Sequence, residues 1–163
     1  MRRRAIIVVG GTGYGKTTLL QAIMGQSLVY KKTQAIEYGP FAIDLPGEFC
    51  QRPLFYHALV SSAPEAEAIW VLQDATARIP GVLRESLMQM RRRGQPVRGI
   101  ITKIDLPAAD LDRAGRLLQS IGVKPPYYPV SAVSGEGLEA LRNLPELRRA
   151  LGSGTDPTPQ DEP

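Results

Sequence analysis

The segment GGTGYGKTT, residues 10–18, restricts the possible folds more than any other stretch of the chain. It follows the apolar run at 5–9, whose β-branched residues favour a buried parallel strand. It leads into residues 16–25, where apolar side chains recur at helical spacing and a glycine stands at the end. A strand, a glycine-rich turn and a helix in direct succession predict an α/β fold.

The same alternation continues along the chain. Short apolar runs predict further strands at 68–72, 97–102 and 127–132. Helical spacing predicts helices at 80–94, 109–122, 137–144 and 145–151. The inner side of the helix at 109–122 is expected to hold Leu111, Ala114, Leu117, Leu118 and Ile121. Strands that alternate with helices predict a mostly parallel sheet with helices on both faces.

The composition is that of one globular domain. Of the 163 residues, 43% are hydrophobic and 22% are charged. We expect a single domain at 1–151 and a disordered tail at 152–163, which lacks large apolar side chains. No apolar run approaches the roughly 20 residues of a membrane-spanning helix. The only cysteine, Cys50, excludes an intramolecular disulfide, so a reducing, cytoplasmic compartment is expected.

The formal net charge is a modest +4. Two arginine clusters, Arg2–Arg4 and Arg91–Arg93, contribute to it. The sequence shows no accompanying set of base-stacking or base-reading residues, so a nucleic acid is not expected as a partner. A membrane is not expected either, because no apolar run is long enough to span one. The first cluster is instead predicted to flank the first strand, and the second to cap the C-terminus of a helix, where cations favour the helix dipole.

The glycine-rich turn has the spacing of a phosphate-binding loop. Gly10, Gly15, Lys16 and Thr17 match G-x-x-x-x-G-K-[ST] between a predicted strand and a predicted helix. Glycines allow the backbone N–H groups to surround phosphates, the lysine reaches the terminal phosphates, and the threonine hydroxyl can bind Mg²⁺. The expected nucleotide contacts of this loop are Gly10, Gly11, Thr12, Gly13, Tyr14, Gly15, Lys16, Thr17 and Thr18.

The stretch TQAIEYGPFAIDLPGE, residues 33–48, is readable as the phosphate-sensing part of a nucleotide switch. Asp44 ends a short apolar run and precedes Pro-Gly, a position from which it would hold the Mg²⁺ shell. The Gly47 N–H would meet the γ-phosphate, and Thr33 would close on Mg²⁺. The turn at 38–40 leaves about four residues for each strand of a short antiparallel hairpin. Thr33 taken alone is equally compatible with an ordinary surface hairpin.

Two later loops have the features of a guanine site. The motif TKID contains Thr102, Lys103 and Asp105 at the end of a predicted strand. The Asp105 carboxylate can accept from the ring N–H and the exocyclic amine of guanine, whereas adenine has neither donor in that place. The Lys103 stem can lie along the base plane. The backbone of Ser131-Ala132 is placed to contact the guanine carbonyl, so GTP or GDP with Mg²⁺ is the expected ligand.

Four motifs in this order resemble those of small Ras-like GTPases. The resemblance implies a three-layer P-loop fold with a mostly parallel six-stranded sheet and a shortened hairpin between its second and third strands. The segments KKTQAIEY at 31–38, DLPGEF at 44–49 and FYHALV at 55–60 further resemble the EutP/PduV family of ethanolamine and propanediol utilisation. This implies a cytoplasmic bacterial protein that docks on the shell of a bacterial microcompartment, and it raises acetate kinase as a second activity.

Three residues depart from the signalling-GTPase pattern. Glu48 stands where those enzymes place the glutamine that orients water, and a carboxylate there is repelled by the phosphates. Thr12 stands at a position that is usually glycine and would crowd the same water. Both substitutions imply slow hydrolysis. Thr102 replaces an asparagine that ties its loop to the phosphate loop, which implies weaker base affinity.

Three functions remain open from the sequence. The first is a slow GTPase or switch, in which Lys16, Thr33, Gly47 and Glu48 act on the γ-phosphate. The second is a small-acid kinase that passes the γ-phosphate to a carboxylate such as acetate. The third is a shell-associated module that nucleotide only stabilises. The exposed edge of the short hairpin also offers a place for a second copy, so a homodimer is one expectation.

Overall fold

The computed structural model describes residues 5–25, 37–38, 42–44, 66–91 and 94–152. Across these ranges, no helix is both long and apolar enough to cross a membrane. The division into a domain and a tail is not tested, because residues 153–163 lie outside these ranges.

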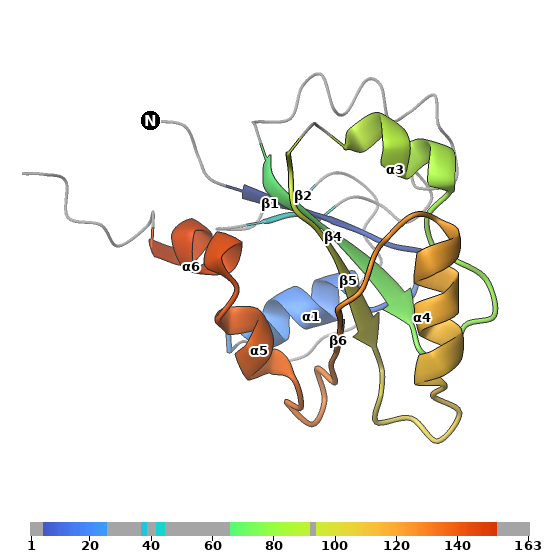
Figure 1. The fold of residues 1–163 in the computed structure, drawn as a ribbon. Coiled ribbons are helices and arrows are strands. Elements are labelled where there is room, and N and C mark those ends of the chain that lie inside the picture. Colours follow the sequence, from blue (N-terminus) through green and yellow to red (C-terminus); the bar gives the residue numbers. More distant parts are fainter. Residues whose placement is uncertain (1–4, 26–36, 39–41, 45–65, 92–93, 153–163) are drawn as a thin grey trace, which may run out of the picture.

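One mixed sheet forms the centre of the molecule (Figure 1). Its strands are β1 (Ala5–Val9), β2 (Glu37–Tyr38), β3 (Ala42–Asp44), β4 (Ala66–Asp74), β5 (Val97–Thr102) and β6 (Tyr127–Pro129), in the spatial order β2-β3-β1-β4-β5-β6. The neighbours β3-β1, β1-β4, β4-β5 and β5-β6 are parallel, and β2-β3 is antiparallel. The α/β fold with a parallel sheet is therefore confirmed.

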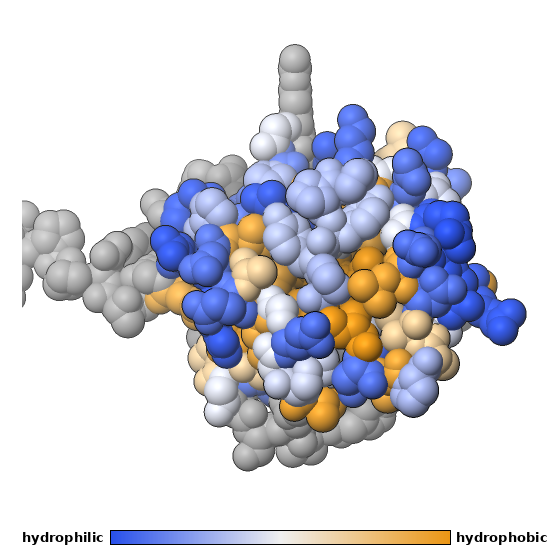
Figure 2. Space-filling view, turned by 60° about the horizontal axis from the view of Figure 1, so that its bottom comes forward, coloured by the Kyte–Doolittle hydropathy of each residue, from blue (hydrophilic) through white to orange (hydrophobic). Residues whose placement is uncertain are grey.

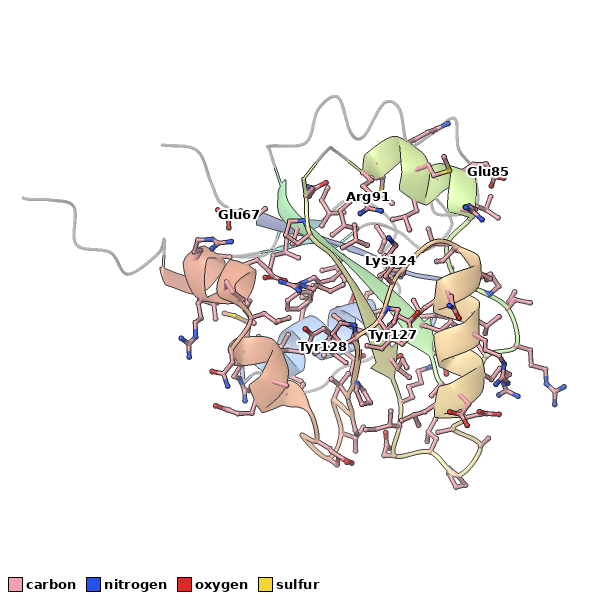
Figure 3. The ribbon with its side chains drawn as sticks, in the orientation of Figure 1. Glu67, Glu85, Arg91, Lys124, Tyr127 and Tyr128 are labelled. Atoms are coloured by element: carbon pink, nitrogen blue, oxygen red, sulfur yellow. The ribbon has the colours of Figure 1, made fainter. Side chains whose placement is uncertain are left out.

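Helices cover both faces of the sheet. They are α1 (Lys16–Ile23), α3 (Arg84–Met90), α4 (Leu111–Ser120), α5 (Leu138–Arg142) and α6 (Pro145–Gly152). One apolar core joins the sheet to α3 and α4, and a second joins it to α1, α5 and α6. Tyr127 and Tyr128 leave β6 toward these two different cores (Figure 3). The result is three layers, with the sheet in the middle.

Some predicted boundaries are wrong. The helix predicted at 80–94 begins only at Arg84, because Leu83 before it is extended and Gly81 packs on the phosphate loop. It ends at Met90 rather than near Gly94, and its C-cap residue is Arg91, the first arginine of the cluster that was predicted to cap it. Residues 92–93 lie outside the described part.

The helix predicted at 109–122 is α4, and it begins after Asp110, whose side chain accepts from the Arg113 N–H. Ala114, Leu118 and Ile121 are buried as predicted, whereas Leu111 is 43% exposed. Leu111 is the first residue of α4 and stands at the exposed end of the helix, beyond the edge of the core that its later turns meet.

Trp70 lies in the centre of β4 and is fully buried. Its indole Nε1 donates to Glu146 Oε1 at 3.2 Å, and Arg98 Nε donates to the same oxygen at 2.8 Å. Arg98 Nη2 also reaches Glu146 Oε2 at 3.1 Å. Glu146 is 1% exposed, so this buried carboxylate is fully engaged in fastening the start of α6 to β4 and β5.

The parallel strands place their carboxyl ends at one edge of the sheet. Loops 10–15, 75–83, 103–110 and 130–137 all leave from that edge. The strand order reverses beside β1, because β3 lies on one side of it and β4 on the other. Ligands of open α/β sheets bind in the crevice at such a reversal, which here adjoins the glycine-rich loop.

Candidate nucleotide-binding site

The glycine-rich loop curves back over the start of α1. Gly13 and Gly15 have φ of 77° and 90°, a left-handed conformation that a side chain disfavours. Gly15 is the N-cap of α1, so Lys16 and Thr17 form the first turn of that helix. Lys16 is 6% exposed, and its Nζ donates to the carbonyls of Gly10 at 3.2 Å and Gly11 at 3.1 Å. The loop thus encloses an ammonium group beside a helix N-terminus, which is the donor set that phosphate oxygens require.

Tyr14 joins the phosphate loop to the loop that follows β4. Its hydroxyl donates to the carbonyl of Ile79 at 2.7 Å. Its ring lies against Gly11 and Gly81, and a Cβ on Gly81 would come within 2.4 Å of the Gly11 nitrogen. Burial, and then the charge of Asp74, raise the pKa of Tyr14, so the phenol stays a neutral donor. The sequence predicted Tyr14 as a nucleotide contact but gave no sign of this packing role.

Thr102 makes a hydrogen bond to the phosphate loop, although it replaces the asparagine that usually makes this connection. Its Oγ1 donates to the Tyr14 carbonyl at 2.7 Å, and the residue is 4% exposed. Threonine therefore connects this loop to the phosphate loop as the asparagine would, and the weaker base affinity expected from the replacement stays a prediction. A threonine at the end of β5 is close enough to span the gap with its short side chain.

Lys103 connects the same two loops from the other side. Its Nζ donates to the Gly13 carbonyl and lies 2.8 Å from Asp74 Oδ2. Lys103 also adopts a left-handed φ of 62°, and its side chain forms part of a cavity wall. Sequence reasoning missed Asp74, although its position at the end of an apolar strand could have singled it out.

Asp105 and Ser131 meet from two different loops. Ser131 Oγ donates to Asp105 Oδ1 at 2.9 Å, and Ser131 is fully buried whereas Asp105 is exposed. The Ser131 N–H donates to the Glu136 carbonyl, and the Gly135 N–H donates to the Ser131 carbonyl, both at 2.9 Å. These bonds give Ser131 a fixed position, and the hydroxyl in turn orients the carboxylate.

A cavity of about 170 Å³ lies between these loops. Its walls come from the first turns of α1, from the loop after β5 and from the loop after β6. Leu106, Val130 and Val133 supply apolar surface, and Asp105 supplies a carboxylate. Figure 2 shows this edge of the sheet, where apolar side chains are exposed among polar ones. An apolar slot with one acid is suited to a flat ring that carries hydrogen-bond donors.

The structure brings together the predicted residues of the phosphate loop and of the two base loops. Thr18, Thr102, Lys103, Asp105 and Ala132 all line the cavity. Thr12 is exposed on the loop, and Thr17 is partly buried. The sequence prediction that these residues bind nucleotide stays a prediction, since no ligand tests it.

The predicted switch residues are only partly described. The backbone of Asp44 ends β3 and pairs with Val8 of β1, so it lies beside the strand that leads into the phosphate loop. The side chain of Asp44 is outside what the structure describes, as are Thr33, Gly47 and Glu48. Within the described residues, no group of three or more His, Cys, Asp or Glu side chains could hold a metal ion.

Comparison with known proteins identifies the family. Residues 3–146 match the model of the PduV-EutP family, described as ethanolamine utilisation and propanediol utilisation. The chain belongs to this family. The resemblance of the sequence to the EutP/PduV family is therefore confirmed.

Individual PduV-EutP relatives cover most of the chain. It is 31% identical to the probable acetate kinase EutP of Salmonella typhimurium over 152 residues, and the aligned region covers 91% of this chain and 91% of the relative. It is 30% identical over 142 residues to the probable acetate kinase EutP of Escherichia coli, covering 85% of this chain and 86% of the relative. It is 39% identical over 103 residues to the propanediol utilization protein PduV of Citrobacter freundii, covering 63% of this chain and 67% of the relative.

Proposed function

We propose that this PduV-EutP protein binds GTP and GDP with Mg²⁺ and hydrolyses GTP slowly. The observation that carries the proposal is the position of the Asp105 carboxylate, which lines an apolar cavity adjoining the phosphate loop. The parallel sheet, the helices on both faces and the antiparallel pair β2-β3 are what a Ras-like GTPase fold requires. These three features support the assignment of a Ras-like GTPase fold to the chain.

Guanine selectivity follows from the chemistry of the cavity. Asp105 can accept two hydrogen bonds from guanine, and the Ser131 hydroxyl already holds one of its oxygens. Adenine offers neither of these donors, so it would cover the carboxylate without replacing the water that the carboxylate loses, and Ser131 would stay its one hydrogen-bond donor, which costs binding free energy. The backbone of Ala132, also in the cavity wall, would meet the guanine carbonyl.

The phosphates would lie in the glycine-rich loop, where Lys16 exchanges its carbonyl partners for phosphate oxygens. Thr17, Asp44 and Thr33 would hold Mg²⁺, which when bound neutralises the charge of the phosphates. The Gly47 N–H would sense the γ-phosphate. Glu48 and Thr12 would slow the attack of water, so that the protein acts as a switch or assembly factor at a microcompartment of ethanolamine or propanediol utilisation.

The test is competitive binding of GTP, GDP and ATP to nucleotide-free protein in Mg²⁺. The proposal predicts a strong guanine preference that collapses in Asp105→Asn. Asp112→Asn, an exposed acid in the first turn of α4, is the matched control and should bind as the wild type does. Equal or better binding of ATP by the wild type would contradict the proposal.

A small-acid kinase is the second candidate, because the Salmonella and Escherichia relatives are named probable acetate kinases. In that reaction an acetate oxygen attacks the γ-phosphorus, the bond to the β-γ bridging oxygen breaks, and acetyl phosphate and a nucleoside diphosphate form. Incubation with acetate and either GTP or ATP, with acetyl phosphate trapped as the hydroxamate, tests this candidate. Inorganic phosphate released equally with and without acetate, and no hydroxamate, would favour hydrolysis.

The third candidate, a shell-associated module that nucleotide only stabilises, predicts no turnover of any nucleotide. Binding alone raises stability by mass action in all three cases, so a melting shift does not separate them. Turnover measured over hours with purified protein does separate them. A GTPase would release phosphate at a rate that Lys16→Ala abolishes.

A further inference from the structure

Asp74 is the last residue of β4, at the edge of the sheet where the phosphate loop and the base loops begin, and its carboxylate has a fixed orientation. Its side chain is 9% exposed. Oδ1 accepts from the Thr76 N–H at 2.8 Å and from Thr76 Oγ1 at 2.7 Å. With two donors on one oxygen, the carboxylate cannot rotate freely, and Oδ2 faces Lys103 at 2.8 Å.

The turn that carries Asp74 is itself tied to its neighbours. The Ala75 N–H donates to the Thr102 carbonyl at 3.0 Å, and the Asp110 N–H donates to the Ala75 carbonyl at 2.9 Å. Arg113 Nη2 reaches the Thr76 carbonyl at 3.3 Å. Residues 75–76, which follow Asp74, are therefore hydrogen-bonded both to the end of β5 and to the start of α4, and these bonds fix the position of the carboxylate.

Lys103 needs such an anchor because of its backbone conformation. Among the residues that the structure describes, it is the single non-glycine residue with positive φ. A left-handed conformation is strained for a residue with a Cβ, so it persists only where other contacts hold it. The bonds from Nζ to Asp74 and to the Gly13 carbonyl fix the end of the side chain, and Lys103 is also one of the residues that line the cavity.

The charge of Asp74 is maintained at neutral pH. Burial on its own would raise the pKa of Asp74, but the hydrogen bonds from Lys103 and Thr76 outweigh it and lower the pKa below its ordinary value. The side chain of Asp74 is 9% exposed and that of Lys103 is 35% exposed, so salt screens their ion pair less than a fully exposed pair.

We propose that Asp74 is a positioning residue for nucleotide binding: it holds Lys103 between the phosphate loop and the base cavity and acts on the nucleotide through Lys103. Without Asp74, Lys103 Nζ keeps its bond to the Gly13 carbonyl but loses its ion pair. The Lys103 side chain is then held less firmly between the cavity and the phosphate loop. The inference rests on the proposed nucleotide site and adds a residue to it.

The test is a double-mutant cycle on GDP affinity, measured by calorimetry with full-length protein in Mg²⁺. The four proteins are the wild type, Asp74→Asn, Lys103→Met and the double variant. Because a hydrogen bond to a charged group contributes about 1.5–3 kcal/mol, Asp74→Asn should weaken GDP binding by roughly tenfold or more. The double variant should bind no more weakly than Lys103→Met alone, because Asp74 acts only through that side chain.

Asp112→Asn is the matched control, since it removes an exposed carboxylate from α4. Thr76→Val is a milder variant for the case that Asp74→Asn does not fold, and it should weaken GDP binding by about threefold, since it removes one of two donors. Unchanged GDP affinity in the folded Asp74 or Thr76 variant, or effects of Asp74→Asn and Lys103→Met that simply add, would overturn the inference and leave the proposed function standing. A wild-type protein without guanine preference would instead overturn the proposed function and this inference with it.

Discussion

The Thr102 hydroxyl lies at the point where the phosphate loop meets the base loop. It donates to the Tyr14 carbonyl at 2.7 Å from a residue that is 4% exposed. Thr102→Val keeps the shape of the side chain but removes this donor. We expect a loss of about 1–3 kcal/mol in the free energy of unfolding, because a buried acceptor loses a partner. Urea unfolding of nucleotide-free protein measures it, and an unchanged midpoint would show that the bond contributes nothing.

Gly137 and Gly135 form a matched pair of glycines in the loop after β6. Both have positive φ, 79° and 84°. A Cβ on Gly137 would lie 2.1 Å from the Pro129 carbonyl oxygen, whereas a Cβ on Gly135 would meet nothing within 4 Å. Gly135→Ala should therefore cost only the backbone strain of roughly 1–2 kcal/mol. Gly137→Ala adds a clash of about 1–3 kcal/mol.

Urea unfolding of the two alanine variants compares these losses directly. Similar destabilisation of both would contradict the close approach of Gly137 to β6. Because Gly137 is the N-cap of α5 and ends the loop that holds Ser131, its substitution should also weaken nucleotide binding more than Gly135→Ala does.

At the scale of elements, Glu146 determines how α6 is fastened to the sheet. Burial on its own would raise the pKa of Glu146, but hydrogen bonds from Arg98, a backbone N–H and Trp70 outweigh it and lower the pKa below the ordinary 4.5. A carboxylate whose pKa is lower in the folded than in the unfolded state stabilises the fold above the unfolded pKa. That contribution is lost as the pH falls through the lowered pKa.

Glu146→Gln should therefore be less stable than the wild type at pH 7, by about 1–3 kcal/mol. The difference should shrink as the pH is lowered through the carboxyl range, because the wild type then loses its charge as well. Glu139→Gln is the control, since Glu139 is 82% exposed and its contact with Arg142 is 3.8 Å long. Thermal unfolding from pH 7 downward measures both, and a constant difference at every pH would contradict the role of the Glu146 charge.

Elements and motifs were predictable where their signals are local. The strand at 5–9, the glycine-rich loop and the helix after it are contiguous, and so are Thr102, Lys103 and Asp105. The start of α3 was misplaced because the contact between Gly81 and Gly11 keeps residues 81–83 out of the helix, and that contact joins distant parts of the chain. Glu146 was missed because its partners Arg98 and Trp70 lie 48 and 76 positions away. The strand-end position of Asp74 was visible in the sequence, but its ion pair with Lys103 was not, since the two residues are 29 positions apart.

At the scale of the whole molecule, ligand binding should stabilise the fold with the selectivity of the base cavity. A ligand at 100 times its Kd raises the free energy of unfolding by about 2.7 kcal/mol. GDP should therefore raise the melting temperature of the wild type, and ADP at the same concentration should not. Asp105→Asn should abolish the effect of GDP. Equal shifts with GDP and ADP would show that binding involves the phosphate loop alone.

Asp105 is the residue proposed to distinguish guanine from other bases. Xanthine has a carbonyl where guanine has its exocyclic amine, so an amide at position 105 can donate to it where the carboxylate would be repelled. The most direct measurement is the affinity of wild-type protein and Asp105→Asn for GDP and xanthosine diphosphate. We predict that the wild type prefers GDP and that the variant prefers xanthosine diphosphate. A wild type that does not distinguish the two, or a variant that keeps the wild-type preference, would contradict the account.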